Sequence, residues 1–231
     1  MNIPLSNRLQ ACAKLIAPGD RVADIGCDHG YLGIHLLTKG IAASVIAADI
    51  NEMPLQSAIR NAEKFGCRDK MSFYLSDGAK NIPRDFDTLV CAGMGADTMI
   101  SILEAAPWLK SEKYRLILQC QSRRPELRKY LYENGFSIRR ETLAQDGKFI
   151  YPITEVVYSP APELTPGGYH ITPALLNSSN PLLPDFYNRV VSGIQTTVDG
   201  LSHSGGEKYE QYCAVLKELK ELEGLVYDNS K

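Results

Sequence analysis

Short apolar runs alternate with amphipathic segments through the first half of the chain. Each apolar run is rich in Val, Ile, Leu and Ala, which is typical of a strand that is buried on both faces. Each amphipathic segment has apolar residues three or four positions apart, which is typical of a helix with one buried face. The predicted strands span residues 21–25, 44–49, 71–75, 86–91 and 115–119. The predicted helices span residues 5–16, 31–39, 52–65, 97–105 and 125–134.

The pattern changes after Gly135. Two further strand-like runs, residues 136–143 and 149–158, flank Asp146-Gly147, a dipeptide that favours a β-hairpin. These runs predict an antiparallel pair that closes the sheet. The alternation of strands and helices as a whole predicts an α/β fold, with a mostly parallel seven-stranded sheet and helices on both faces.

The last third of the chain has a different composition. Residues 159–184 are rich in Pro, Gly, Ser and Asn and are interpreted as a linker. Residues 184–201 and 208–227 have helical spacing, and the second segment keeps a roughly heptad spacing with Glu and Lys between. These two segments predict a C-terminal, coiled-coil-like α-helical hairpin. We therefore expect two domains, residues 1–160 and residues 161–231.

Composition narrows the class of protein. The chain has 231 residues, of which 44% are hydrophobic and 23% are charged, as in a globular protein. No apolar run is long enough to cross a membrane, and the N-terminus lacks a signal-peptide pattern. Six scattered cysteines without a C-x-x-C pair favour a reduced cytoplasmic location over disulfides or zinc. A net charge of -2 means that any nucleic-acid binding must use a local basic patch.

The turn after the first predicted strand has the spacing Gly26-x-x-x-Gly30 and carries two acids, Asp24 and Asp28. A dinucleotide fingerprint requires a glycine where Asp28 stands, because that position faces a pyrophosphate. A carboxylate there disfavours NAD. A positively charged cofactor suits the two acids better, and S-adenosylmethionine carries a sulfonium and an ammonium group. The alternative is a tight turn with only a structural role.

The next two strands also end in acids. Asp49 is expected to accept the ribose hydroxyls of a nucleoside cofactor, although it could instead cap the following helix. Asp77-Gly78 is expected to meet the adenine, although it could be a plain turn. The predicted cofactor-binding residues are Asp24, Gly26, Cys27, Asp28, His29, Gly30, Asp49, Ile50, Asp77, Gly78 and Ala92.

The predicted reaction site follows the fourth strand. Gly93 and Gly95 allow a flat substrate to approach closely, and Met94 offers an adaptable apolar contact. The candidate catalytic residues are these three and Asp28 of the first turn, that is Asp28, Gly93, Met94 and Gly95. His29 is a candidate base. However, methyl transfer from S-adenosylmethionine to a ring nitrogen of a substrate needs little help from a base and depends mainly on positioning. The spacing of His, Cys and acidic residues predicts no metal site.

Several arginines are predicted to contact RNA phosphates. Arg123, Arg124 and Arg128 cluster after the fifth strand, and Arg8 lies in the first helix. The alternative for the cluster is a solvated helix face.

Several motifs together resemble one known family. They are Ser6-x-Arg8-Leu9, residues 23–32 (ADIGCDHGYL), residues 92–95 (AGMG), residues 116–119 (LILQ) and Leu127-Arg128. This set resembles the bacterial tRNA (adenine(22)-N1)-methyltransferase family, often called TrmK. The chain departs from the usual family pattern at Cys120, where a proline commonly follows the glutamine.

The resemblance implies a fold and an activity. The fold is a Rossmann-like class I methyltransferase domain with a C-terminal coiled-coil-like helical domain. The implied activity is transfer of a methyl group from S-adenosyl-L-methionine to N1 of adenine 22 in the D-loop region of tRNA. We thus expect an enzyme with tRNA as its partner and with neither membrane nor metal. The sequence does not settle the oligomeric state, for which a monomer is the expectation.

Two other hypotheses stay open at this point. A small-molecule methyltransferase would use the same cofactor without needing the basic cluster. A non-catalytic protein would bind the cofactor or tRNA without transferring a methyl group.

Overall fold

A single mixed sheet organises the part of the chain that the computed structural model describes, which is residue 3 and residues 5–228. The strands are β1 (Asp20–Ile25), β2 (Ala42–Asp49), β3 (Met71–Leu75), β4 (Thr88–Met94), β5 (Arg115–Cys120), β6 (Phe136–Asp146) and β7 (Phe149–Tyr158). Among these residues the sheet has seven strands in the order β3-β2-β1-β4-β5-β7-β6, and β7 runs antiparallel to both of its neighbours. The predicted fold class is confirmed, including the hairpin at Asp146-Gly147.

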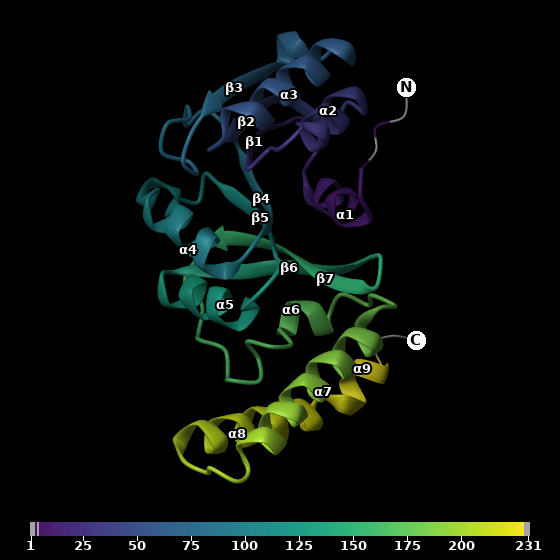
Figure 1. The fold of residues 1–231 in the computed structure, drawn as a ribbon, viewed down its shortest axis with the longest axis vertical. Coiled ribbons are helices and arrows are strands. Elements are labelled where there is room, and N and C mark those ends of the chain that lie inside the picture. Colours follow the sequence, from purple (N-terminus) through teal and green to yellow (C-terminus); the bar gives the residue numbers. More distant parts are fainter. Residues whose placement is uncertain (1–2, 4, 229–231) are drawn as a thin grey trace.

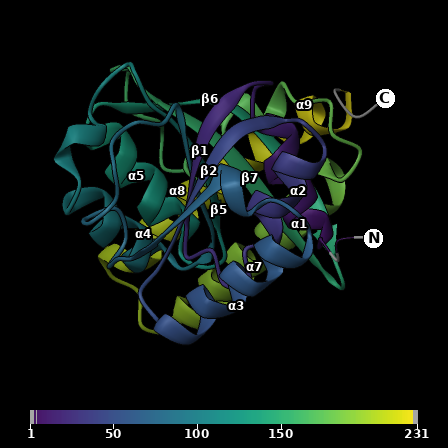
Figure 2. The ribbon, with the colours of Figure 1, turned by 90° about the horizontal axis from the view of Figure 1, so that it is seen from above.

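Helices cover both faces of the sheet (Figures 1 and 2). The helices are α1 (Asn7–Leu15), α2 (Tyr31–Thr38), α3 (Glu52–Lys64), α4 (Ala96–Glu104), α5 (Arg124–Glu133), α6 (Pro173–Leu176), α7 (Leu183–Leu201), α8 (Glu207–Glu221) and α9 (Glu223–Asp228). In Figure 2, α1 and α2 lie on one side of the strands, and α4 and α5 lie on the other. The sheet therefore separates two apolar cores.

The central strands are apolar throughout because both of their faces are buried. Val22 packs in the core under α1, α2 and α3, whereas its neighbour Ala23 packs in the core under α4 and α5. Both side chains are fully buried. Successive residues of a strand point to opposite faces, so a strand between two cores needs apolar residues at every position.

The fourth strand differs from its predicted bounds of 86–91. It begins at Thr88 and continues to Met94, with an irregularity in its pairing to β5 between Ala92 and Met94. Gly93 has a φ of 87° at this irregularity. A left-handed residue inside a strand resembles a turn in the sequence, which is why the prediction ended the strand too early.

The interpretation of residues 159–184 as a linker is wrong for its second half. Ile171, Thr172 and Leu175 are buried, and Thr172 caps the short helix α6 by accepting from the Leu175 N–H at 3.0 Å. The segment packs because it supplies apolar side chains to the core beneath α7 and α8. A composition rich in Pro and Gly hid this short packed helix.

The C-terminal helices form the predicted hairpin and lie against the sheet domain (Figure 1). Their core contains Phe186, Leu216 and Leu219, and it also contains Leu143 and Ile150 from the β6–β7 hairpin. The predicted last helix is two helices, because the chain turns between α8 and α9. None of the helices in the described residues is long and apolar enough to span a membrane.

A buried ion pair connects the packed segment to the sheet domain. Arg128 of α5 pairs with Glu141 of β6, and both side chains are almost fully buried. Arg128 also donates to the carbonyls of Tyr169 and His170, at 2.8 and 2.9 Å. Glu141 accepts from the hydroxyl of Thr172 as well. Arg128 therefore has a structural position, which corrects the prediction that it contacts RNA.

We expect Arg128→Ala to lower the free energy of unfolding by about 3–5 kcal/mol, because Glu141 would keep a buried charge without its cation. Urea denaturation followed by circular dichroism measures this change. The matched control on the same helix is Lys129→Ala, since Lys129 is exposed and pairs with Glu133 at 3.7 Å. The control should lose less than about 1 kcal/mol. Equal losses in the two variants would contradict the structural role of Arg128.

Candidate cofactor and substrate site

A pocket of about 260 Å³ lies at the carboxyl ends of β1 to β4. The strand order reverses between β1 and β4, and such a reversal is where open α/β sheets bind their ligands. The lining residues come from the strand ends, the loop after β3, and α4. They are Ile25, Gly26, Asp49, Ile50, Ser76, Asp77, Gly78, Lys80, Met94, Thr98, Ser101, Ile102 and Ala105. The pocket thus contains Gly26, Asp49, Ile50, Asp77, Gly78 and Met94 of the predicted site residues.

The turn after β1 is closed by hydrogen bonds within the protein. The N–H groups of Gly26 and Cys27 both donate to the carbonyl of Ala48, at 2.8 and 3.0 Å. Gly26 has a φ of 71°, and a Cβ there would collide with the Cε atom of Met94. These N–H groups are therefore occupied, and the carboxylates around the turn are the main polar groups that a ligand can use.

Asp24 is a buried carboxyl group at the end of β1. Its exposed fraction is 5%, and it has no hydrogen-bond or ion-pair partner among residues 3 and 5–228. Burial, together with the nearby carboxylate of Asp49, raises the pKa of Asp24 to about 7. A buried carboxylate without a donor is unfavourable, so an incoming ammonium or N–H group would stabilise it.

Asp49 links the turn to the pocket. One carboxylate oxygen accepts from the Asp28 N–H at 3.2 Å, and the other accepts from the Asn51 N–H at 2.9 Å. The N-cap of α3 is Asn51 rather than Asp49, so the alternative of Asp49 as the cap residue does not hold. Each carboxylate oxygen has a further lone pair for a ligand hydroxyl.

The opposite wall of the pocket combines a charged pair with an apolar side chain. Asp77 pairs with Lys80, and both side chains are about half exposed. A Cβ on Gly78 would lie 2.8 Å from Ile102, so the loop packs closely on α4. Ile50 is largely exposed beside this loop.

The remaining predicted cofactor residues lie around the pocket rather than in its wall. The side chain of Asp28 is 73% exposed and lies 3.6 Å from the ring of His29. Asp28 also has a φ of 51°, a left-handed conformation that Asp tolerates better than most residues. Cys27 is buried, and burial raises the pKa of its thiol. Gly30 begins α2 and packs closely on Ala58.

A second polar group lies behind the predicted reaction site. The Arg8 guanidinium covers Gly93, where a Cβ would come within 3.3 Å of the Nη1 atom. The same nitrogen donates to the Oε1 atom of Gln119 at 2.9 Å. Gln119 is fully buried, and its Nε2 atom has no partner within the described residues. Sequence reasoning missed Gln119 as a site residue, although a polar residue that ends an apolar strand was a usable signal.

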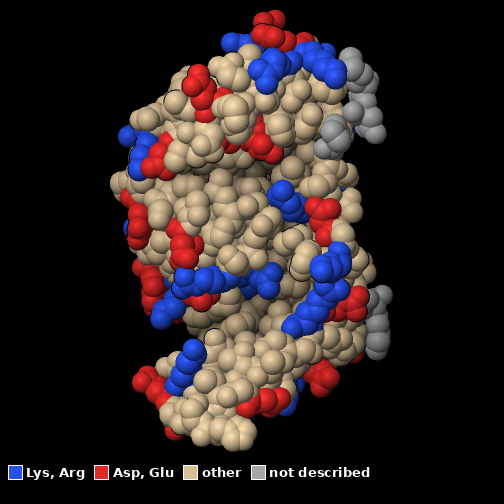
Figure 3. Space-filling view, viewed as in Figure 1, with Lys and Arg blue, Asp and Glu red and all other residues tan. Residues whose placement is uncertain are grey.

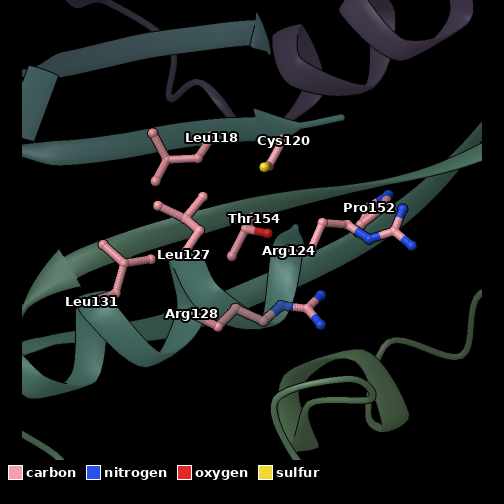
Figure 4. Close-up of a pocket in the computed structure, with 8 residues that line it drawn as sticks. All are labelled: Leu118, Cys120, Arg124, Leu127, Arg128, Leu131, Pro152 and Thr154. Carbon is pink, nitrogen blue, oxygen red and sulfur yellow. The ribbon is translucent and has the colours of Figure 1, made fainter. Parts of the chain in front are cut away.

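The basic cluster on α5 is not an open phosphate site. Arg123 is exposed but pairs with Asp97 and Glu126. Arg124 lies over the ring of Phe186 at 5.2 Å and, with Arg128, lines a small cavity under α5 (Figure 4). Burial lowers the pKa of Arg124, with the charge of Arg128 as a further cause. RNA contacts of Arg123 and Arg124 stay predictions.

The fold and the acidic pocket together define a Rossmann-like domain of the class that binds a nucleoside cofactor. The chain belongs to the methyltransferase domain family, whose sequence model matches residues 5–154, and within it to the TrmK family.

Known proteins resemble this chain over most of its length. The Bacillus subtilis tRNA (adenine(22)-N(1))-methyltransferase is 36% identical over 148 residues, which cover 63% of this chain and 62% of that protein. The crystal structure of the B. subtilis M1A22 tRNA methyltransferase TrmK has a TM-score of 0.79 at 27% identity and covers 100% of both chains. A putative tRNA (m1A22) methyltransferase from Streptococcus pneumoniae, in complex with S-adenosyl-L-methionine, has a TM-score of 0.78 at 27% identity, with 95% and 99% coverage.

The raised pKa of Asp24 predicts a pH-dependent stability. The folded state holds a proton on this carboxyl up to about pH 7, whereas an aspartate exposed to water in the unfolded chain has a pKa of 3.8. Stability from this group is therefore present at low pH and is lost as the pH rises through about 7. Asp24→Asn stays neutral, so it should exceed the unliganded wild type at pH 8 by at least about 1.4 kcal/mol, the equivalent of one pKa unit.

Urea denaturation of wild type and Asp24→Asn between pH 5 and pH 8, a range that spans the pKa of about 7, measures the difference in stability. The control is Asp77→Asn, which removes an exposed carboxylate from the wall of the adjacent pocket. A stability difference between Asp24→Asn and wild type that does not change with pH would refute the assignment.

Proposed function

We propose that this protein is a tRNA (adenine-N1)-methyltransferase that modifies adenine 22, in the D-loop region. The observation that carries the proposal is the buried, unpartnered carboxyl of Asp24 beside a pocket with two further acids. An acidic pocket suits a cationic cofactor, and the putative tRNA (m1A22) methyltransferase from S. pneumoniae is in complex with S-adenosyl-L-methionine. The methylated position is inferred from the B. subtilis relative.

Different residues in and beside the pocket would bind different groups of the cofactor. S-adenosyl-L-methionine, when bound, supplies an electrophilic methyl group on a sulfonium centre. Asp24 would receive the ammonium group, and Asp49 would accept from the ribose hydroxyls. Asp77 would accept from the adenine amine while Ile50 covers one side of the ring. Gly26 keeps the turn low enough for Met94 to reach the pocket.

The target adenine would lie against Gly93–Gly95, exposed from the tRNA as a flipped base. Its N1 lone pair is the nucleophile, so holding the base in place contributes most of the catalysis and a general base is not needed. The product adenine is cationic. Asp28, at the mouth of the pocket, would stabilise that charge.

The C-terminal helices would hold the rest of the tRNA. On the face in Figure 3, Lys and Arg side chains gather around a hollow between the sheet domain and these helices. Phosphates favour such a surface. The proposal includes a boundary near residue 160 between the cofactor-binding domain and the C-terminal helical domain. A tRNA substrate and six free cysteines are consistent with a cytoplasmic enzyme.

Nucleoside mass spectrometry tests the proposed function. Unmodified tRNA is incubated with the protein and isotope-labelled S-adenosyl-L-methionine, and labelled 1-methyladenosine is expected. A transcript with guanine in place of adenine 22 is the control and should stay unlabelled. Label only in small molecules, or cofactor binding without any transfer, would overturn the proposal.

We expect Asp28→Asn to lower kcat at least tenfold, which equals about 1.4 kcal/mol of transition-state stabilisation. Asparagine tolerates the left-handed conformation at this position, so the change removes the charge without straining the turn. The dissociation constant for S-adenosyl-L-methionine, measured by calorimetry, should change little. His29→Ala is the control on the neighbouring exposed side chain. An unchanged kcat in Asp28→Asn would remove Asp28 from the reaction.

A further inference from the structure

The tip of the β6–β7 hairpin extends past the edge of the sheet that carries the pocket. The last paired residues of β5 and β7 are Leu118 and Thr154, and β5 ends at Cys120. β7 begins at Phe149, so its first residues have no partner on β5 and pair with β6 alone. The hairpin therefore stands beside the reaction site, close to α1 (Figure 1).

The pairing register shows which face of the hairpin its aromatic residues occupy. Phe149 is opposite Asp146, and Tyr151 is opposite Ala144. Opposite residues of an antiparallel pair point to the same face. Ala144 packs in the core with α1, and Asp146 lies 3.9 Å from the Nε atom of Arg8. Phe149 and Tyr151 therefore lie on the face that also carries Arg8.

Phe149 is one of the large apolar residues that remain about half exposed. Its exposed fraction is 52%, and the ring centroid of Tyr151 lies 6.0 Å away with a tilt of 42°. The Nζ atom of Lys148 lies 5.3 Å from the Phe149 centroid. An exposed ring with a second ring and a cation beside it is the combination that binds unpaired nucleotides, through stacking and a phosphate contact.

Arg8 connects this aromatic pair to the reaction site. The Nη1 and Nη2 atoms of its guanidinium lie over Gly93, and the Nε atom of the same group lies 3.9 Å from Asp146. A nucleic-acid strand with one base at Gly93 would pass Arg8 and reach Phe149.

We propose that Phe149 and Tyr151 stack on an unpaired nucleobase next to the methylated adenine, while Lys148 contacts its phosphate. This proposal rests on the proposed function, since it assigns a second binding position to the same RNA. RNA is favoured over a protein partner because the surface joins an aromatic pair to Lys148 and Arg8 and continues into the reaction site.

Steady-state kinetics of two variants test the stacking. Phe149→Ala should raise the KM for tRNA about tenfold, with a smaller change in kcat and no change in S-adenosyl-L-methionine affinity. Phe149→Trp keeps an aromatic face and should retain the wild-type KM. If Phe149 only stabilised the fold, both variants would raise the KM, or Phe149→Ala would lower kcat. Either result would contradict the stacking role.

An abasic tRNA tests the identity of the stacked group. When the base on either side of adenine 22 is removed, one of the two substrates should bind wild type as weakly as Phe149→Ala binds intact tRNA. The two losses should not add, because they remove the same contact. Fully additive losses for both substrates would overturn the proposal.

The salt dependence of tRNA binding tests the cation. Lys148→Ala should reduce the slope of log Kd against log salt concentration by about one. Lys64→Ala is the matched control. The Nζ atom of Lys64 also lies over an aromatic ring, 5.9 Å from the centroid of Phe65, but Lys64 is on α3 and not on the hairpin. Equal slopes for the two variants would remove Lys148 from the RNA contact.

The outcomes separate the two proposals. If wild type forms no 1-methyladenosine, the proposed function fails. If wild type forms it and Phe149→Ala matches wild type in KM, the stacking proposal alone fails. If Phe149→Ala abolishes binding of a protein partner while its KM for tRNA is unchanged, RNA is not the ligand of the Phe149–Tyr151 surface.

Discussion

The site depends on two carboxyl groups, Asp24 and Asp49, that lie near one another at one edge of the sheet. Asp24 and Asp49 end neighbouring parallel strands, so they meet at the same edge. Asp49 stabilises its charge with two backbone N–H groups, whereas Asp24 is buried beside it with a pKa near 7. Within the described residues, Asp24 thus carries a buried carboxyl group without a hydrogen-bond donor at this edge of the sheet, and a cationic ligand would relieve it. Binding strength here comes at the expense of stability.

A second set of buried charges holds the C-terminal part in place. Glu141 receives Arg128 from one side and Thr172 from the other, which connects α5, β6 and the segment before α7. Glu155 on β7 is fully buried and pairs with Arg140. Buried pairs of this kind contribute little net stability, but breaking one is costly. The Arg128–Glu141 pair specifies how the segment before α7 docks on the sheet. The Glu155–Arg140 pair instead connects β7 to β6 within the sheet.

The sequence predicted elements wherever a local pattern and the packing agree. β3 has the predicted bounds, because an apolar run between clear turn residues leaves one choice. The end of β4 was missed because Gly93 resembles a turn, and the packed segment around Thr172 was missed because its contacts are with Glu141, 31 residues earlier. The two acids that line the pocket were predictable because Asp49 ends β2 and Asp77 follows the end of β3 closely. The burial of Arg128 was not, since a basic helix residue looks the same in sequence whether it is solvated or paired.

The position of β7 has a consequence for biosynthesis. β7 is the last strand to be made, yet it lies between β5 and β6 in the sheet. While the ribosome is still adding residues up to Tyr158, β5 is an unprotected edge and β6 has no neighbour at all. The nascent chain can build the cofactor-binding half first, but the side of the sheet that supports the helical hairpin closes in one late insertion. That interval is when the chain is most exposed to wrong strand pairing and most dependent on chaperones.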